Sequence, residues 1–162
     1  MTTIVRPPAH AGVSRDQRGL SIVLPSNATG GALAVVGCDI PAATAGPPLH
    51  IHPGSDETFI VQSGTLLVHL DGDVTELRAD DLVHIPRGTR HTFATPPGSA
   101  ARFLTLHTPG GFEQFHAAAA DAERLRGAPL PPADLMDLAA GFDWQLAGPP
   151  LLPTGVLLTS PP

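Results

Sequence analysis

The chain has 162 residues, 42% of them hydrophobic, and a formal net charge of −6 at pH 7, which fits one domain with one core. No basic cluster occurs, so we expect neither nucleic acid nor a membrane surface as a partner. The absence of Lys and Tyr excludes lysine Schiff-base and phenol chemistry, and the single Cys excludes an internal disulfide.

The N-terminal quarter of the chain predicts an arm followed by two strands. Residues 1–19 are polar and contain Pro, so we expect a loose arm. Residues 20–24 predict a strand that ends at a Pro-Ser-Asn turn, and residues 32–40 predict a longer apolar strand. Residues 41–48 contain three Pro and predict a loop.

From residue 49 onward, short apolar runs alternate with turn signals. The pair Asp71-Gly72 between two apolar runs is a strong hairpin signal. Short strands joined by Gly, Asp and Pro turns are typical of an antiparallel sandwich or barrel. We therefore expect an all-β fold, with strands at residues 57–62, 65–70, 74–77, 82–85, 91–95 and 102–107.

The apolar period changes after Pro109-Gly110-Gly111. Phe112, Phe115 and Ala119 fall at helical spacing, and Gly127 can end the helix. A second short helix is expected over residues 132–140, and the Pro-rich tail should be extended or mobile. The expected organisation is an arm (1–19), a barrel (20–108), a helical segment packed on it (109–147) and a tail (148–162).

Four side chains in the predicted strands form a candidate metal site. His50 and His52 are two apart in an extended stretch, so both imidazoles point to one face. Glu57 begins the next strand and His91 begins a later one. Three imidazoles and one carboxylate suit one divalent Fe, Ni, Mn, Co, Cu or Zn ion and are too rich in nitrogen for Ca or Mg.

These residues carry a resemblance to a known family. The stretch from Gly46 through His50-Ile51-His52 and Glu57 to Gly64 resembles the first motif of the cupin superfamily. The stretch from Asp80 through Pro86 and Gly88 to His91 and Thr95 resembles the second motif, with Asp80 in place of a Gly and Thr95 in place of an Asn. The resemblance implies a double-stranded β-helix, or jelly roll, whose metal ligands are His50, His52, Glu57 and His91.

The later part of the chain is similar to small single-domain cupins of the quercetin-dioxygenase-like type. This resemblance implies a dioxygenase-like oxidoreductase that acts on an aromatic or enolic small molecule, with Glu57 also serving as the catalytic base. Two alternatives stay open, because one fold hosts many reactions. They are a non-redox cyclase, isomerase or decarboxylase of polyketide-like substrates, and a non-catalytic small-molecule-binding cupin.

Side chains that share a strand face with the ligands are the expected substrate contacts. Phe59 and Val61 follow Glu57 at a spacing of two, and Phe93 and Thr95 follow His91 in the same way. His107 ends a strand and can face the cavity. The strands at 20–24 and 32–40 are candidates for a homodimer interface, and without an apolar signal segment a cytoplasmic location is expected.

Overall fold

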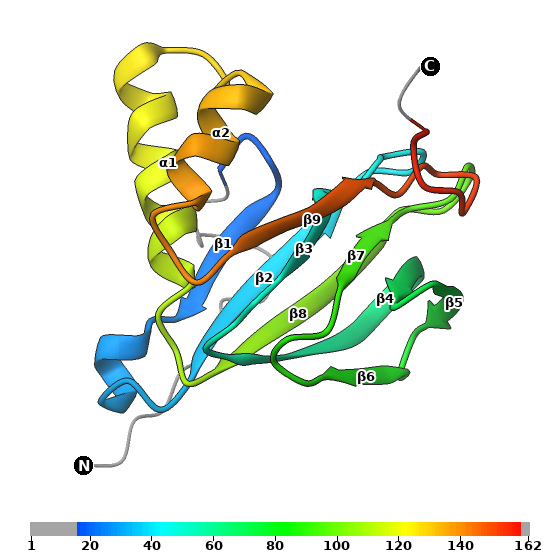
Figure 1. Ribbon diagram of the computed structural model, residues 1–162, viewed down its shortest axis with the longest axis horizontal. Helices are drawn as coiled ribbons and strands as arrows, with labels where there is room; N and C mark the ends of the chain where they lie inside the picture. Colours follow the sequence, from blue (N-terminus) through cyan, green and yellow to red (C-terminus); the bar gives the residue numbers. More distant parts are fainter. Residues whose placement is uncertain (1–15, 160–162) are drawn as a thin grey trace.

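The computed structural model describes residues 16–159 and has the predicted all-β class with two helices near the C-terminal end (Figure 1). A one-turn 3-10 helix, η1, follows β1. The elements are β1 (Leu20–Leu24), η1 (Ser26–Thr29), β2 (Ala34–Ile40), β3 (Pro48–Ile51), β4 (Asp56–Leu70), β5 (Asp73–Arg78), β6 (Leu82–Ile85), β7 (His91–Ala94), β8 (Ala101–Thr108), α1 (Glu113–Arg126), α2 (Pro132–Ala139) and β9 (Gln145–Pro150).

The strands form two antiparallel sheets that share β4. One sheet has the order β1-β2-β8-β4-β6, and the other has the order β5-β4-β7-β3-β9. Neighbours in each sheet come from distant parts of the chain, as when β2 pairs with β8. This is the jelly-roll arrangement predicted from the sequence. Because β1 is an end strand of its sheet, it stays a predicted dimer contact.

Strand β4 corrects one sequence prediction. Two strands were expected, over residues 57–62 and 65–70, but the backbone is extended without a break from Asp56 to Leu70. Its pairing with β8 shifts register between Val61 and Ser63, which marks a β-bulge. The bulge bends β4, so its first half pairs with β8 and β6 and its second half with β5 and β7.

Gly64 sits at this bend in a conformation that only glycine adopts at low cost. Its φ is +79°, and a Cβ there would lie 1.7 Å from the carbonyl oxygen of Ala100.

We expect Gly64→Ala to cost more than the ~1–2 kcal/mol of left-handed strain alone, because the backbone must also move. Urea denaturation measures this cost. Gly98→Ala is the matched control, since Gly98 has φ +82° with nothing within 4 Å of its Cβ position. Equal costs for the two variants would contradict the expected clash.

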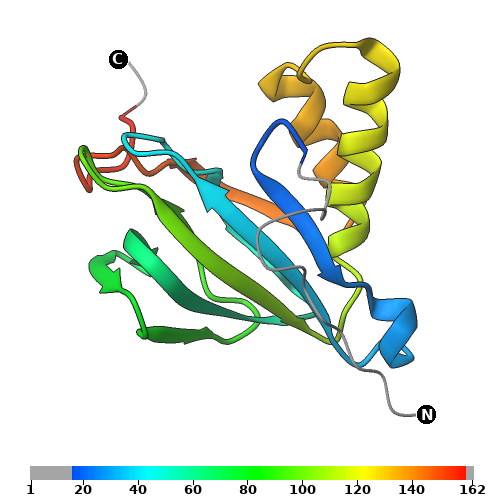
Figure 2. The ribbon, with the colours of Figure 1, turned by 180° about the vertical axis from the view of Figure 1, so that it is seen from behind.

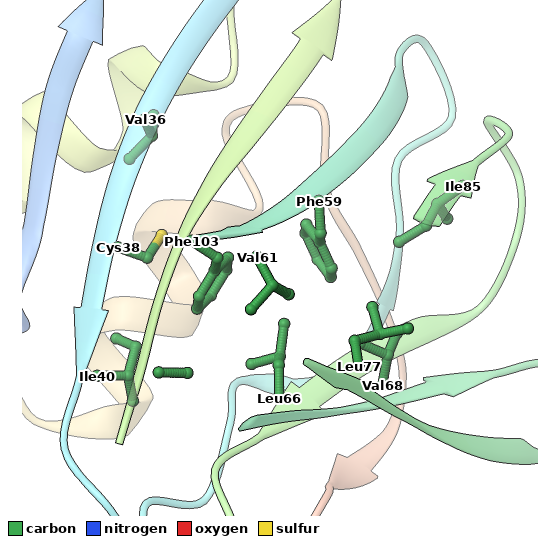
Figure 3. Close-up of a cluster of buried hydrophobic side chains, with 11 residues drawn as sticks. Val36, Cys38, Ile40, Phe59, Val61, Leu66, Val68, Leu77, Ile85 and Phe103 are labelled. Carbon is green, nitrogen blue, oxygen red and sulfur yellow. The ribbon is translucent and has the colours of Figure 1, made fainter. Parts of the chain in front are cut away.

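The main core lies between the two sheets. Along β2, residues alternate between buried and partly exposed, so that Val36, Cys38 and Ile40 face inward. Figure 3 shows these side chains facing those of β4 and β8, with Phe59 and Phe103 near the middle of the cluster. The predicted apolar strand thus buries every second residue, because successive strand residues point to opposite faces.

Helices α1 and α2 pack together at one side of the sheets, where α1 runs alongside β1 (Figure 2). Gly127 ends α1 in a left-handed conformation, as predicted. Phe112, Phe115 and Trp144 belong to a second apolar cluster between the helices and the barrel. Within residues 16–159, no helix has the length and apolar character needed to cross a membrane.

Both ends of the described chain are more ordered than the sequence suggested. The predicted arm lies mostly outside the described residues, but Arg18 docks on α1, where Nη2 donates to the carbonyl of His116 at 3.2 Å. At the other end, residues of the expected tail pair as β9 against β3, with Pro150 opposite Pro48. The boundary expected between residues 147 and 148 falls inside β9. Residues 148–150 of the expected tail thus belong to the sheet, and the chain then turns back, with Leu151 bridged to Leu157 and the N–H of Leu152 donating to the carbonyl of Val156 at 2.8 Å.

Candidate metal centre

Three strands and the turn after one of them bring the predicted ligands to one place. His50 on β3 lies directly opposite His91 on β7 in the strand register, and His52 follows the end of β3. Glu57 lies near the start of β4. All four are buried, and one ligand atom from each lies within 4.8 Å of the others. The structure therefore brings together the four residues that the spacing singled out.

Each imidazole is held by a hydrogen bond to a main-chain carbonyl. Nδ1 of His50 donates to Pro48 O at 2.7 Å, and Nδ1 of His91 donates to Thr89 O at 2.9 Å. Nδ1 of His52 donates to the carbonyl of Asp143. A carbonyl only accepts, so these bonds place the ring hydrogen on Nδ1 and leave Nε2 of each His as the atom that faces the cluster.

The arrangement fits a cation chemically. Nε2 of His91 lies 2.9 Å from Glu57 Oε2, and Nε2 of His52 lies 3.5 Å from the same oxygen. A ring whose single hydrogen is on Nδ1 has no hydrogen between these atoms, so its Nε2 lone pair faces a buried carboxylate. Nε2 of His52 has no hydrogen-bond partner within residues 16–159. A divalent cation satisfies all these lone pairs at once.

The electrostatics of His50 and Glu57 agree with this chemistry. Burial, followed by the neighbouring His91 and His52, holds the pKa of His50 well below its usual value, which keeps the ring neutral. Burial alone would raise the pKa of Glu57, but its contacts with His107, His52 and His91 hold that pKa well below the usual range. Glu57 therefore stays ionised. Burial lowers the pKa of His52, but the Glu57 carboxylate outweighs burial and raises it.

His107, a predicted substrate contact, lies beside Glu57. The two residues are direct partners in the register of β4 and β8, and His107 Nε2 lies 3.2 Å from Glu57 Oε1. His107 is fully buried. The carboxylate therefore has one oxygen facing His107 and the other facing His52 and His91. The role of His107 as a substrate contact stays a prediction.

The predicted apolar contacts lie on the core side of the cluster. Phe59 and Val61 are buried in the main core, and Phe93 packs against it. The Phe59 ring centre is 6.4 Å from that of His91, and it meets Phe93 edge to face at 5.8 Å. Of these three residues, Phe59 therefore contacts a ligand directly, and their role as substrate contacts stays a prediction.

Thr95 holds a loop of the barrel. Its hydroxyl donates to Pro41 O at 2.5 Å and accepts from the backbone N–H of Thr44 at 3.0 Å. The Thr95 side chain therefore binds the main chain of the 41–44 loop. Its predicted role as a substrate contact stays untested by these contacts. Asp80 keeps a left-handed φ of +72°, so it preserves the turn at the position where the family motif has Gly.

Sequence reasoning did not assign three residues that contact the centre. The Phe112 ring centre is 4.4 Å from that of His52. Trp144 stacks on His50 at 5.8 Å with 25° between the planes, and Asp143 accepts the bond from His52. The sequence placed Phe112 in the helical segment that packs on the barrel, without assigning it a contact with a ligand. The one signal for Trp144 was its being the single Trp of the chain.

His116 on α1 predicts a pH dependence of stability. This residue is partly buried, and its Nδ1 has no partner within the described residues. Burial, followed by the positive charge of Arg18, lowers the pKa of His116 to about 3. An unfolded His has a pKa of about 6.5. Between these values the unfolded chain binds one more proton than the folded chain, so stability falls as the pH drops from 6.5 toward 3.

We therefore expect His116→Gln to flatten the curve of unfolding free energy against pH in that window. The flattening is at most about 1.4 kcal/mol per pH unit. Urea denaturation of the metal-free protein at several pH values measures it. Gln114→Ala on the exposed face of the same helix should keep the wild-type slope, and an unchanged slope in His116→Gln would contradict the expectation.

A family model described as "Cupin domain" matches residues 38–107. Among curated proteins, the oxidoreductase iacF of Pestalotiopsis fici is 45% identical to the chain over 62 residues, which are 38% of this chain and 30% of that protein. The chain thus spans less than a third of the length of this relative. The region that the family model matches contains the four candidate ligands, and it ends before α1, α2 and β9.

Solved structures resemble the chain in fold. A cupin protein from Bacteroides fragilis has a TM-score of 0.52 and 24% identity, over 62% of this chain and 83% of that one. The polyketide cyclase RemF from Streptomyces resistomycificus has a TM-score of 0.52 and 21% identity, over 67% of this chain and 79% of that one. At these identities the likeness is one of fold.

Proposed function

The chain belongs to the cupin superfamily, and from this premise we propose that it is a metal-dependent enzyme, a dioxygenase-like oxidoreductase that acts on an aromatic or enolic small molecule. The observation that carries the proposal is the convergence of three Nδ1-anchored imidazoles on an ionised carboxylate. A site with three His and one carboxylate leaves coordination positions for a substrate.

The residues of the cluster have separate tasks in this proposal. Nε2 atoms of His50, His52 and His91, with Oε2 of Glu57, would hold the metal. A redox-active metal, when bound, supplies the electron transfer that dioxygen needs to react with a closed-shell organic molecule. The Glu57 carboxylate accepts the proton of the substrate hydroxyl, and its ionised state at neutral pH makes it able to do so.

The surroundings of the ligands support the substrate class. An aromatic ring lies beside each of the three His ligands, with Phe59 beside His91, Phe112 beside His52 and Trp144 beside His50. Such rings favour a flat apolar molecule over a sugar or a charged metabolite. The relative named as an oxidoreductase supports the reaction class over the non-redox alternatives.

Metal analysis and oxygen uptake test the proposal together. The protein is purified without chelator, its metal content is measured, and separate samples are loaded with Fe, Mn, Co, Ni or Cu. We expect oxygen uptake with a flavonol as the probe in at least one loaded form, and none in Glu57→Gln. Absence of uptake in every form would overturn the oxygenase reading for this substrate class.

The alternatives give different results in the same samples. Conversion of a polyketide-like probe without oxygen uptake, and with Zn as well as redox metals, would support a Lewis-acid cyclase, isomerase or decarboxylase in place of the oxygenase. Binding of the probe without conversion would support a non-catalytic binding protein. The fold of RemF alone does not favour the cyclase.

A further inference from the structure

We propose that the turn between α2 and β9, at Asp143 and Trp144, is a built part of the metal centre and that Asp143 is a positioning residue for its ligands. The turn follows the second helix and leads into β9, which lies against β3 (Figure 1). Both residues lie outside residues 38–107, the part that the family model matches. The inference rests on the metal centre of the proposed function but not on the reaction.

Asp143 is connected to the ligand loop at three points. Its carbonyl accepts the Nδ1 hydrogen of His52. Its Oδ1 accepts from the backbone N–H of Gly54 at 2.7 Å, and its Oδ2 accepts from the Ser55 hydroxyl at 2.6 Å. Residues 53–56 link the ligands His52 and Glu57, so this one residue fixes both a ligand ring and the loop that spaces it from the next ligand.

Gly54 and Ser55 fit this contact closely. A Cβ on Gly54 would lie 3.1 Å from Asp143 Oδ1, so the backbone approaches the carboxylate where a side chain would crowd it. Ser55 is 4% exposed, so its hydroxyl has little access to water and depends on Asp143. The loop is therefore shaped around the carboxylate.

The second ligand, His50, is held by the residues that follow. Trp144 is 8% exposed and stacks on the His50 ring. Directly after it, Gln145 and Leu146 pair with Ile51 and His50 in the β9–β3 register. The turn and the start of β9 thus fix the backbone of one ligand and the rings of both.

This geometry predicts an effect on metal affinity. A carbonyl that accepts from Nδ1 of a ligand His orients the ring and raises the basicity of its Nε2, and loss of such partners typically costs ~10–100-fold in affinity. Without its side-chain bonds, Asp143 is free to move its carbonyl away from His52. We therefore expect Asp143→Ala to lower the affinity for Co²⁺ by roughly 10–100-fold.

Trp144 provides the measurement. It is the only Trp in a chain without Tyr, and its stack on His50 makes its fluorescence sensitive to a paramagnetic ion at the ligands. Titration of the metal-free protein with Co²⁺ gives the affinity from quenching, and the visible absorption of Co²⁺ reports its coordination geometry. Neither readout requires enzyme activity.

Two variants separate positioning from general stability. Asp143→Asn keeps an acceptor for Gly54 and can donate to the Ser55 hydroxyl, so it should recover most of the affinity. Asp134→Ala removes an exposed carboxylate from α2 and should bind Co²⁺ as the wild type does. A wild-type affinity and spectrum in Asp143→Ala would overturn the proposal.

Ser55→Ala keeps the test decisive if Asp143→Ala does not fold. It removes only the Oδ2 contact, so we expect a smaller loss of affinity, and an unchanged affinity would overturn the proposal. A wild-type protein that binds no Co²⁺ would instead overturn the metal centre itself. A wild type that binds Co²⁺ but shows no oxygen uptake would leave this inference standing and remove only the proposed reaction.

Discussion

Replacement of His52 by Ala is expected to abolish stoichiometric metal binding. His52 is 2% exposed, and its Nε2 faces Glu57 with no hydrogen-bond partner within residues 16–159. Removing this ligand leaves two imidazoles and one carboxylate, and it also removes the link to Asp143. The loss in affinity should exceed the ~100-fold upper range of an outer-shell partner, because a bond to the metal itself is lost.

Metal analysis after dialysis and Co²⁺ titration measure this loss. His84→Ala is the matched control, because His84 is an exposed His on β6 whose Nδ1 lies 3.0 Å from the hydroxyl of Thr58, away from the four ligands. It should retain one metal ion per chain. Full metal occupancy in His52→Ala, with circular dichroism like that of the wild type, would refute the proposed ligand set.

Replacement of Phe103 by Ala is expected to lower the free energy of unfolding by several kcal/mol. Phe103 on β8 has no exposed surface, and its ring meets Phe59 at 5.6 Å and Phe93 at 5.2 Å, both edge to face. Phe103 lies within the cluster of buried side chains in Figure 3, on the strand between β2 and β4, so its truncation leaves a cavity in the core. Such a change costs about 3–5 kcal/mol, a large part of a typical total stability of roughly 5–15 kcal/mol.

Urea denaturation of wild type and variant, both metal-free, measures the difference, because a bound ion would add its own stabilisation. Leu82→Ala on β6 is the control, since Leu82 is 57% exposed and its truncation should change stability by less than about 0.5 kcal/mol. A cost below about 1 kcal/mol for Phe103→Ala would show that the three rings do not form the packed centre of the core.

The three aromatic rings also connect the metal centre with the core. Phe59 contacts Phe103 on one side and the ligand His91 on the other. The same strand, β4, carries Glu57, Phe59 and the bend at Gly64. Changes deep in the core therefore reach the ligands through one strand, and metal affinity should be measured whenever a core variant is tested.

The sequence determined the features that depend on local periodicity. A strand has a side-chain period of two, so the spacing of His50 and His52 was enough to place both rings on one face. The Asp71-Gly72 pair and Gly127 indicated the β4–β5 hairpin and the end of α1 for equally local reasons.

Only the tertiary structure decided which distant segments meet at those ligands. His52 and Asp143 are 91 residues apart, and His107 becomes the partner of Glu57 only through the pairing of β4 with β8. No local pattern encodes such contacts, because they depend on how whole strands and helices pack. The same reason explains β9. Its Pro-rich sequence does not predict a strand, and it is extended because it pairs with β3 at the edge of the sheet.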